Sequence, residues 1–207
     1  MTLMTMGMQL PFDQLYMASD ARKAGKKSGD AFVKMKDGRE MIPRLLAISS
    51  GGGHWVELQR MRKAFEGSEV TWVTVREGYR VDLKDQSDRF IVIPDATRWN
   101  KVGLVILFFK VMLVIMRVRP HAIVTTGAAP GLLALMVGRT LGCKTCWIDS
   151  IANMEEMSLS GKKARRWANL WLTQWAHLSS EEGPEYHGSV LQNFCREETG
   201  ERMERAE

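Results

Sequence analysis

Residues 49–58, SSGGGHWVEL, join a short apolar run to a stretch with helical spacing, and this junction constrains the fold more than any other feature of the chain. The apolar run, residues 45–49, is typical of a buried parallel strand. In residues 54–65, which follow the glycines, the apolar side chains fall near one helical face. A strand that passes through three glycines directly into a helix is typical of the first turn of a doubly wound α/β fold.

Strand-like and helix-like segments alternate along the rest of the chain. Strands are expected at residues 69–75, 89–93, 121–125 and 144–149, helices at residues 130–141 and 161–177, and a long apolar segment at residues 99–118. This alternation predicts a single Rossmann-like α/β domain over residues 44–207, with a parallel sheet covered on both faces. Residues 1–43 are polar and charged without a sustained period, so we expect a disordered extension there.

The charge and cysteine content indicate the kind of partner and the compartment. The formal net charge is +5, which favours an anionic partner but does not separate nucleic acid, an acidic membrane and a phosphate-bearing substrate. Three cysteines and the lack of a visible secretory leader favour a reducing, cytosolic setting. Cys143 and Cys146 lie three apart in a strand-like segment, so they should point to opposite faces and share neither a disulfide nor a metal ion.

The glycine run predicts an anion site. Glycines let backbone N–H groups approach a phosphate closely, and the start of the following helix adds unpaired N–H donors. The alternative is a tight turn with no ligand. A neutral imidazole at His54 could accept a proton from a sugar hydroxyl, or it could simply bond a loop carbonyl. Glu57 is expected to cap the helix, although it could also orient the His54 ring.

Two common phosphate motifs do not fit this loop. A Walker loop needs Gly-Lys-Ser/Thr, and His54 and Trp55 stand in its place. The dinucleotide fingerprint G-x-G-x-x-G matches at Gly51 and Gly53, but its third glycine falls on Val56. A dinucleotide-binding enzyme therefore remains an alternative.

Two later stretches resemble those of a known family. Together with the glycine loop, residues 125–135, TTGAAPGLLAL, and 147–166, WIDSIANMEEMSLSGKKARR, resemble motifs of the MurG-like GT-B glycosyltransferases. The narrower resemblance is to the membrane-associated, acceptor-side subunit of the two-part UDP-N-acetylglucosamine transferase of asparagine-linked glycosylation. Its bacterial exopolysaccharide counterparts, which include glucuronosyltransferase subunits, are similar too. The similarity covers residues 44 to about 191 in motif order and spacing.

The resemblance implies a half-enzyme equivalent to the N-terminal half of a GT-B glycosyltransferase. Such a subunit binds a polyprenyl-diphosphate-linked saccharide, and a separate catalytic subunit binds the UDP-sugar that donates N-acetylglucosamine or glucuronic acid. Residues 44–207 have room for one domain, so the chain is expected to be inactive without its partner. No cofactor and no metal ion are expected. A non-catalytic membrane adaptor is the other alternative.

The family's site residues carry over onto three loops. The first loop, facing the acceptor diphosphate, comprises Gly51, Gly52, Gly53 and His54. The second comprises Thr126, Gly127, Ala128, Pro130 and Gly131, and the third comprises Asp149, Ser150 and Asn153. His54 is the candidate catalytic base, and Asp149 is a second candidate, although an aspartate at a strand end is also a common helix cap.

The apolar segment at residues 102–116 indicates how the chain meets a membrane. It is too short to span a bilayer, Lys110 interrupts it, and basic residues flank it. It has more apolar surface than a sheet can cover, so the surplus should meet lipid or the partner subunit. The alternatives are a buried core helix and a spanning helix. The residues expected to contact the membrane are Val102, Ile106, Phe108, Phe109, Leu113, Met116 and Arg117.

A second basic and aromatic element lies at residues 161–177. As a helix it would place Trp167, Trp171 and Trp175 on one face, with lysines and arginines at its start. The tryptophans could pack on the sheet, or they could lie among anionic headgroups beside the basic residues. The resulting expectation is a peripheral or monotopic protein at the cytoplasmic face of a membrane.

Overall fold

The computed structural model describes residues 33–34, 40–83, 88–96 and 99–191. A seven-stranded, entirely parallel sheet occupies its centre, in the order β5-β4-β3-β6-β7-β8-β9. The strands are β3 (Arg44–Ile48), β4 (Glu69–Thr74), β5 (Arg89–Val92), β6 (Ala122–Thr125), β7 (Lys144–Ile148), β8 (Leu170–Thr173) and β9 (Glu185–Tyr186). The chain builds outward from β3 to one edge and then from β6 to the other, so the order reverses between β3 and β6.

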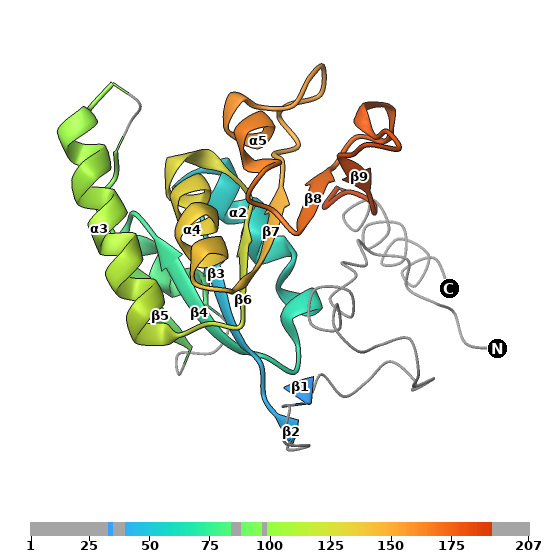
Figure 1. Ribbon diagram of the computed structural model, residues 1–207. Helices are drawn as coiled ribbons and strands as arrows, with labels where there is room; N and C mark the ends of the chain where they lie inside the picture. The colour runs from blue at the N-terminus through green and yellow to red at the C-terminus, as the bar shows by residue number, and fades with distance from the viewer. Residues whose placement is uncertain (1–32, 35–39, 84–87, 97–98, 192–207) are drawn as a thin grey trace, which may run out of the picture.

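Helices cover both faces of the sheet (Figure 1). One face carries α2 (Gly53–Arg60) and the 3-10 helix η1 (Arg62–Phe65), and the other carries α3 (Lys101–Val118), α4 (Ala128–Thr140) and α5 (Leu159–Ala164). Two further 3-10 helices are η2 (Glu77–Asp82) and η3 (Ala176–Leu178). Strand β3 alternates between two buried cores, with Leu45 packed on the α2 side and Leu46 on the α3 and α4 side. The predicted α/β domain with a doubly covered parallel sheet is confirmed.

The predicted helix at residues 161–177 is wrong. Helix α5 ends at Ala164, and residues 170–173 form strand β8, which pairs with β7. Aromatic and branched side chains suit a half-buried pleated surface, and pairing with a buried neighbour decides between strand and helix here. The tryptophans therefore share no helical face. Trp171 donates its indole N–H to the Gly161 carbonyl, and Trp175 donates to the Ile151 carbonyl.

The segment before the domain contains a two-stranded antiparallel sheet. It pairs β1 (Val33–Lys34) with β2 (Glu40–Met41). Residues 1–32 and 35–39 lie outside the described residues, so the disordered extension expected over residues 1–43 stays a prediction.

The two cysteines of the C-x-x-C pattern lie on opposite sides of the sheet, as predicted. Cys146 belongs to the α2-side core and Cys143 to the α4-side core, and both are free thiols. Burial raises the pKa of each thiol, which keeps both protonated and unreactive.

Helix α4 approaches strand β6 so closely that one position on it must be glycine. A Cβ added to the buried Gly131 would overlap the Thr125 side chain, whose Cβ and Cγ2 would both lie 3.0 Å away. Threonine is branched at Cβ and cannot easily move aside. Gly131 therefore serves helix–strand packing in this fold.

We expect Gly131→Ala to lower the free energy of unfolding by about 1–3 kcal/mol, because the added methyl forces α4 away from β6. Gly78→Ala is the matched control, since no atom lies within 4 Å of the added Cβ there. Urea denaturation followed by circular dichroism measures both variants. Equal stabilities of the two variants would contradict the close approach.

Candidate functional site

The loops that follow β3 and β6 meet at the carboxyl edge of the sheet, where the strand order reverses. This is the position at which open α/β sheets bind ligands. Thr126 donates its hydroxyl to the backbone carbonyl of His54 at 2.7 Å. The His54 ring lies against Gly127, since a Cβ there would sit only 2.8 Å from the ring Cε1. The first and second predicted loops are therefore in direct contact, through His54.

Helices α2 and α4, which follow β3 and β6, lack side-chain caps. Helix α2 is preceded by Gly52 with φ +68°, and α4 by Gly127 with φ +133°, and a glycine has no side chain that could cap the helix. By contrast, Asn100 caps α3 and Ser158 caps α5. The first turn of a helix leaves N–H donors without intrahelical partners. At α2 the Trp55 N–H bonds the Gly52 carbonyl, and at α4 Pro130 has no N–H. The first two N–H groups of each helix have no partner among the described residues and remain for a ligand.

Tyr79 of η2 supports the glycine loop, and sequence analysis missed it. Its hydroxyl accepts the Gly52 N–H at 2.8 Å, and its ring stacks on Trp55 with centroids 5.4 Å apart. A Cβ at Gly51 would press against this hydroxyl, whereas Gly52 and Gly53 are exposed and have open space around them. Tyr79 thus holds one side of the glycine loop, and the other side is open to solvent.

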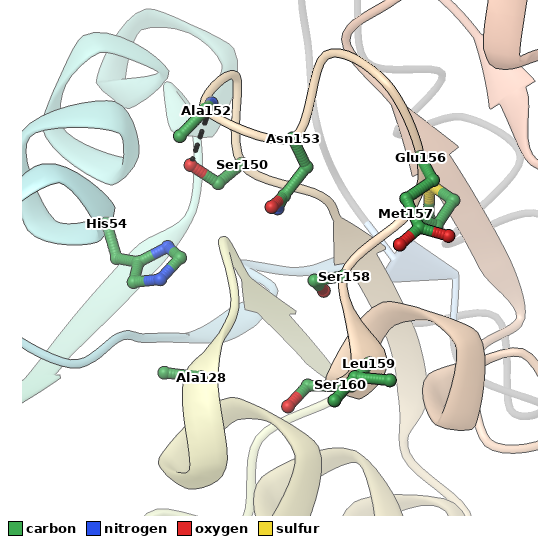
Figure 2. Close-up of a pocket in the computed structure, with 10 residues that line it drawn as sticks. All are labelled: His54, Ala128, Ser150, Ala152, Asn153, Glu156, Met157, Ser158, Leu159 and Ser160. Carbon is green, nitrogen blue, oxygen red and sulfur yellow. Dashed lines mark hydrogen bonds between the residues drawn. The ribbon is translucent and has the colours of Figure 1, made fainter.

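A cavity of about 430 Å³ lies beside this contact (Figure 2). Its wall comes from α2, from the start of α4 and from the loop between β7 and α5. The lining residues are His54, Ala128, Ser150, Ala152, Asn153, Glu156, Met157, Ser158, Leu159 and Ser160. Of the predicted site residues, His54, Ala128, Ser150 and Asn153 line the cavity.

The other residues of the second loop are buried and determine the conformation of its backbone. Thr126, Gly127, Pro130 and Gly131 are buried. Ala128, the exception that lines the cavity, has φ +62°, a strained value for a residue with a Cβ. Such strain at a ligand-binding edge is typical of functional loops.

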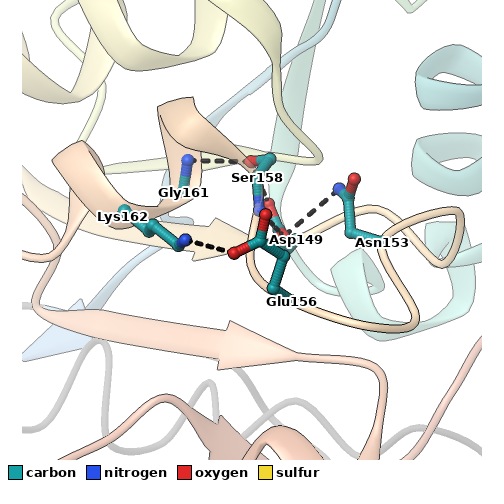
Figure 3. Close-up of polar contacts among 6 residues, drawn as sticks. All are labelled: Asp149, Asn153, Glu156, Ser158, Gly161 and Lys162. Atoms are coloured by element: carbon teal, nitrogen blue, oxygen red, sulfur yellow. Dashed lines mark hydrogen bonds and ion pairs between the residues drawn. The ribbon is translucent and has the colours of Figure 1, made fainter.

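Asp149 is buried and fully occupied by hydrogen bonds (Figure 3). Its two oxygens accept from the Trp147 indole, the Asn153 amide, and both the backbone N–H and the hydroxyl of Ser158, at 2.6–3.2 Å. Asp149 does not line the cavity. These contacts favour a role in positioning the loop between β7 and α5 over the role of catalytic base.

Glu57 is a buried carboxylate behind the cavity wall. It accepts hydrogen bonds from the Ser150 hydroxyl at 2.7 Å and from the Gln174 amide at 3.1 Å. The expectation that it caps α2 is wrong, because it ties α2 to the ends of β7 and β8 instead. Burial raises the pKa of Glu57, while the Ser150 hydrogen bond and the nearby His54 lower it in part. In the sequence, only its spacing of three residues from His54 indicated that Glu57 could belong to the site.

The His54 ring is half-buried between the two loops. Its Nδ1 atom is buried and has no hydrogen-bond partner among the described residues. A half-buried imidazole that lines a cavity has the placement expected of a proton acceptor or of a ligand contact, although its buried Nδ1 atom is not the one that a ligand can reach. In the described part of the chain, no group of acidic, histidine and cysteine side chains could hold a metal ion.

Helix α3 exposes an apolar face. One face of α3 is buried against the sheet, through Leu107, Val111 and Ile115. The opposite face is open to solvent, which rules out a fully buried core helix. Of the residues expected to contact a membrane, Phe108 is half-buried and the others are exposed: Val102, Ile106, Phe109, Leu113, Met116 and Arg117. Among the helices that the structure describes, none has the length and apolar character needed to cross a bilayer.

Solved structures share this fold. The sequence matches no family model and none of the curated proteins compared with it. The fold is similar to MurG of Acinetobacter baumannii, with a TM-score of 0.57 and 16% identity over 72% of this chain and 46% of that chain. It is also similar to UDP-N-acetylglucosamine 2-epimerase of Rickettsia bellii, with a TM-score of 0.57 and 13% identity over 76% and 48% of the two chains.

The chain therefore spans about half the length of these solved proteins. At such identities the likeness shows the fold alone. That fold is a single α/β domain equivalent to the N-terminal, Rossmann-like half of GT-B enzymes such as MurG, as the sequence predicts.

The buried Glu57 should make stability depend on pH. A carboxyl group whose pKa is raised on folding binds its proton more tightly in the folded state, so stability falls as pH rises from the ordinary glutamate pKa through the raised one. Glu57→Gln removes this group and can keep its bonds by donating to Ser150. As the pH rises above the ordinary glutamate pKa, the wild type should lose unfolding free energy relative to Glu57→Gln. Glu66→Gln, at an exposed position, is the control and should parallel the wild type.

Proposed function

We propose that this chain is the acceptor-binding, membrane-associated subunit of a two-component glycosyltransferase. It binds a polyprenyl-diphosphate-linked saccharide, and a second polypeptide supplies the UDP-sugar that donates N-acetylglucosamine or glucuronic acid. The observation that carries the proposal is the pair of glycine-capped helices that open onto one cavity beside His54. The resemblance of the three loops to the acceptor-side subunits of such enzymes supports the same assignment.

The uncapped helix starts suit a diphosphate. Backbone N–H groups and the partial positive charge at a helix N-terminus stabilise phosphate oxygens. Gly52 and Gly53 leave the outer side of the α2 start open, so a phosphate can approach the backbone there. The start of α4 supplies a second set of donors across the His54 ring.

The reaction is a direct displacement at the anomeric carbon of the donor sugar. A hydroxyl of the acceptor saccharide attacks that carbon, the bond to the UDP oxygen breaks, and UDP leaves. The hydroxyl proton must pass to a base. His54 is the candidate, because its side chain lines the cavity, while Asp149 is enclosed by donors and does not.

The exposed face of α3 supports attachment to a membrane surface. Its apolar side chains lie beside Lys101, Lys110 and Arg117, and the helix contains no acidic residue. Apolar contact with lipid and attraction to anionic headgroups add to each other in a helix that lies in the interface. We infer peripheral binding at the cytoplasmic face.

We expect the purified chain to transfer no sugar from UDP-N-acetylglucosamine or UDP-glucuronic acid to a polyprenyl-diphosphate saccharide. Activity should appear when the subunit resembling the sugar-nucleotide half is added, and His54→Ala should then lower kcat about 10²- to 10⁴-fold. Radiolabelled transfer measures both. Robust transfer by the lone chain would contradict the division into subunits. Unchanged activity of His54→Ala would favour a non-catalytic adaptor.

We expect Phe109→Glu to lower binding to vesicles that contain anionic lipid by at least about tenfold, because it places a charge where an aromatic ring is buried in the interface. Co-sedimentation with vesicles of phosphatidylglycerol and phosphatidylcholine measures the partitioning. Val81→Glu is the matched control, since Val81 is 80% exposed on η2 rather than on α3. If both variants bind as the wild type does, α3 does not face the lipid.

A further inference from the structure

On the cavity wall between β7 and α5, two serine hydroxyl protons are donated to buried carboxylates rather than to the cavity. Ser150 gives its one hydroxyl proton to Glu57 at 2.7 Å, and its oxygen accepts the backbone N–H of Ala152 at 3.3 Å. A hydroxyl oxygen has two lone pairs, so one remains. Toward a ligand, Ser150 can then only accept a hydrogen bond.

Two further lining residues are polarised in the same sense by Asp149 (Figure 3). Ser158 gives its hydroxyl proton to Asp149 at 2.6 Å, and Asn153 turns its amide nitrogen to the same carboxylate at 3.2 Å. A carboxylate only accepts, so Asn153 must present its NH₂ group to Asp149. Its carbonyl oxygen then remains available as an acceptor, beside the second N–H of the amide. Ser158 also accepts the Gly161 N–H, which leaves one lone pair on its oxygen.

Two buried carboxylates thus set the polarity of one wall. Glu57 is 4% exposed and Asp149 is 2% exposed, so water does not compete for the hydrogen bonds that they accept. The opposite side of the cavity is lined by His54 and Ala128, at the starts of α2 and α4, where the N–H groups of the first turn have no side-chain cap. The cavity therefore has a donor side and an acceptor side.

We propose that the acceptor side, formed by Ser150, Asn153 and Ser158, is a saccharide subsite that accepts hydrogen bonds from sugar hydroxyls. The proposal rests on the proposed function and fixes the direction in which the substrate lies. The diphosphate occupies the donor side, at the helix starts, and the sugar that carries the reacting hydroxyl occupies the acceptor side. Glu57 and Asp149 are positioning residues, since they act through the side chains that touch the sugar.

The chemistry of this wall favours a neutral polyol over the other ligands that it could meet. Phosphate oxygens need donors, and both serine hydroxyl protons of this wall go to the two carboxylates, which leaves only the second N–H of Asn153 among these three side chains. An ammonium group would need a free negative charge, but Glu156, which also lines the cavity, is bonded to Lys162 at 2.6 Å. Sugar hydroxyl groups carry no charge and can donate hydrogen bonds, so they suit a wall that mainly accepts hydrogen bonds and has no free negative charge.

The test compares two soluble probes on the full chain, by isothermal titration calorimetry. One probe is farnesyl diphosphate, and the other is the same lipid diphosphate linked to N-acetylglucosamine. The wild type should bind the sugar-bearing probe more tightly. Ser150→Ala and Asn153→Ala should each weaken the sugar-bearing probe by up to about tenfold, the value of one hydrogen bond, and leave farnesyl diphosphate unchanged.

A variant of the buried Glu57 tests the direction of the Ser150 hydrogen bond itself. Glu57→Gln replaces the carboxylate with an amide that donates to Ser150, which frees the serine proton and reverses the polarity of its oxygen. This variant should therefore reproduce the loss seen in Ser150→Ala, and the double variant should lose no more than either single variant. A purely structural role for Glu57 predicts equal losses for both probes.

The controls separate this proposal from the proposed function. Ser179→Ala and Glu66→Gln, at exposed positions away from the cavity, should leave both affinities unchanged. Thermal unfolding confirms that each variant is folded, and Asn153→Ala, at a half-buried position, serves if Ser150→Ala does not fold. Equal wild-type binding of the two probes, or equal losses for both in the variants, overturns the saccharide subsite alone. Failure of the wild type to bind either probe overturns the diphosphate site as well.

Discussion

The parallel pairing of β3 with β6 is the constraint on which the rest of the site depends. These strands are neighbours in the sheet, although about 70 residues separate them and β4, β5 and α3 intervene. Because they run in the same direction, the loops that follow them emerge side by side, and each turns at once into a helix through a glycine with positive φ. The His54 ring then fills the space that the missing side chain of Gly127 leaves open.

Local chemistry explains why the sequence predicts this much of the molecule and no more. Three features depend on residues that are contiguous in the sequence: the glycine run, the apolar strands and the surplus apolar surface of α3. Periodicity and turn chemistry therefore predict them. Strand β8 cannot be recognised in this way. The tryptophans around it are spaced as in a helix, and only its pairing with β7 makes it a strand. Glu57 is a similar case. Its partners Ser150 and Gln174 lie 93 and 117 residues away, and no local pattern announces them.

The two buried carboxylates differ in how the surroundings compensate their charge. Asp149 is enclosed by four donors within one loop and its strand, which makes it part of the loop's own structure. Glu57 is reached from β7 and β8, and its raised pKa shows that burial outweighs these bonds. A buried charge that is not fully compensated lowers stability, so its presence beside a cavity is better explained by the site than by the fold.

In the proposed function, the position of α3 brings the cavity close to a membrane surface. Strand β5 ends at the same sheet edge as β3 and β6, because all the strands are parallel, and eight residues separate its end from the start of α3. The helix then runs back toward the amino edge over about 27 Å, at 1.5 Å per residue. Its exposed apolar face therefore starts near the edge that carries the cavity. With that face on a bilayer, a diphosphate at the starts of α2 and α4 can stay attached to a lipid chain that remains in the membrane.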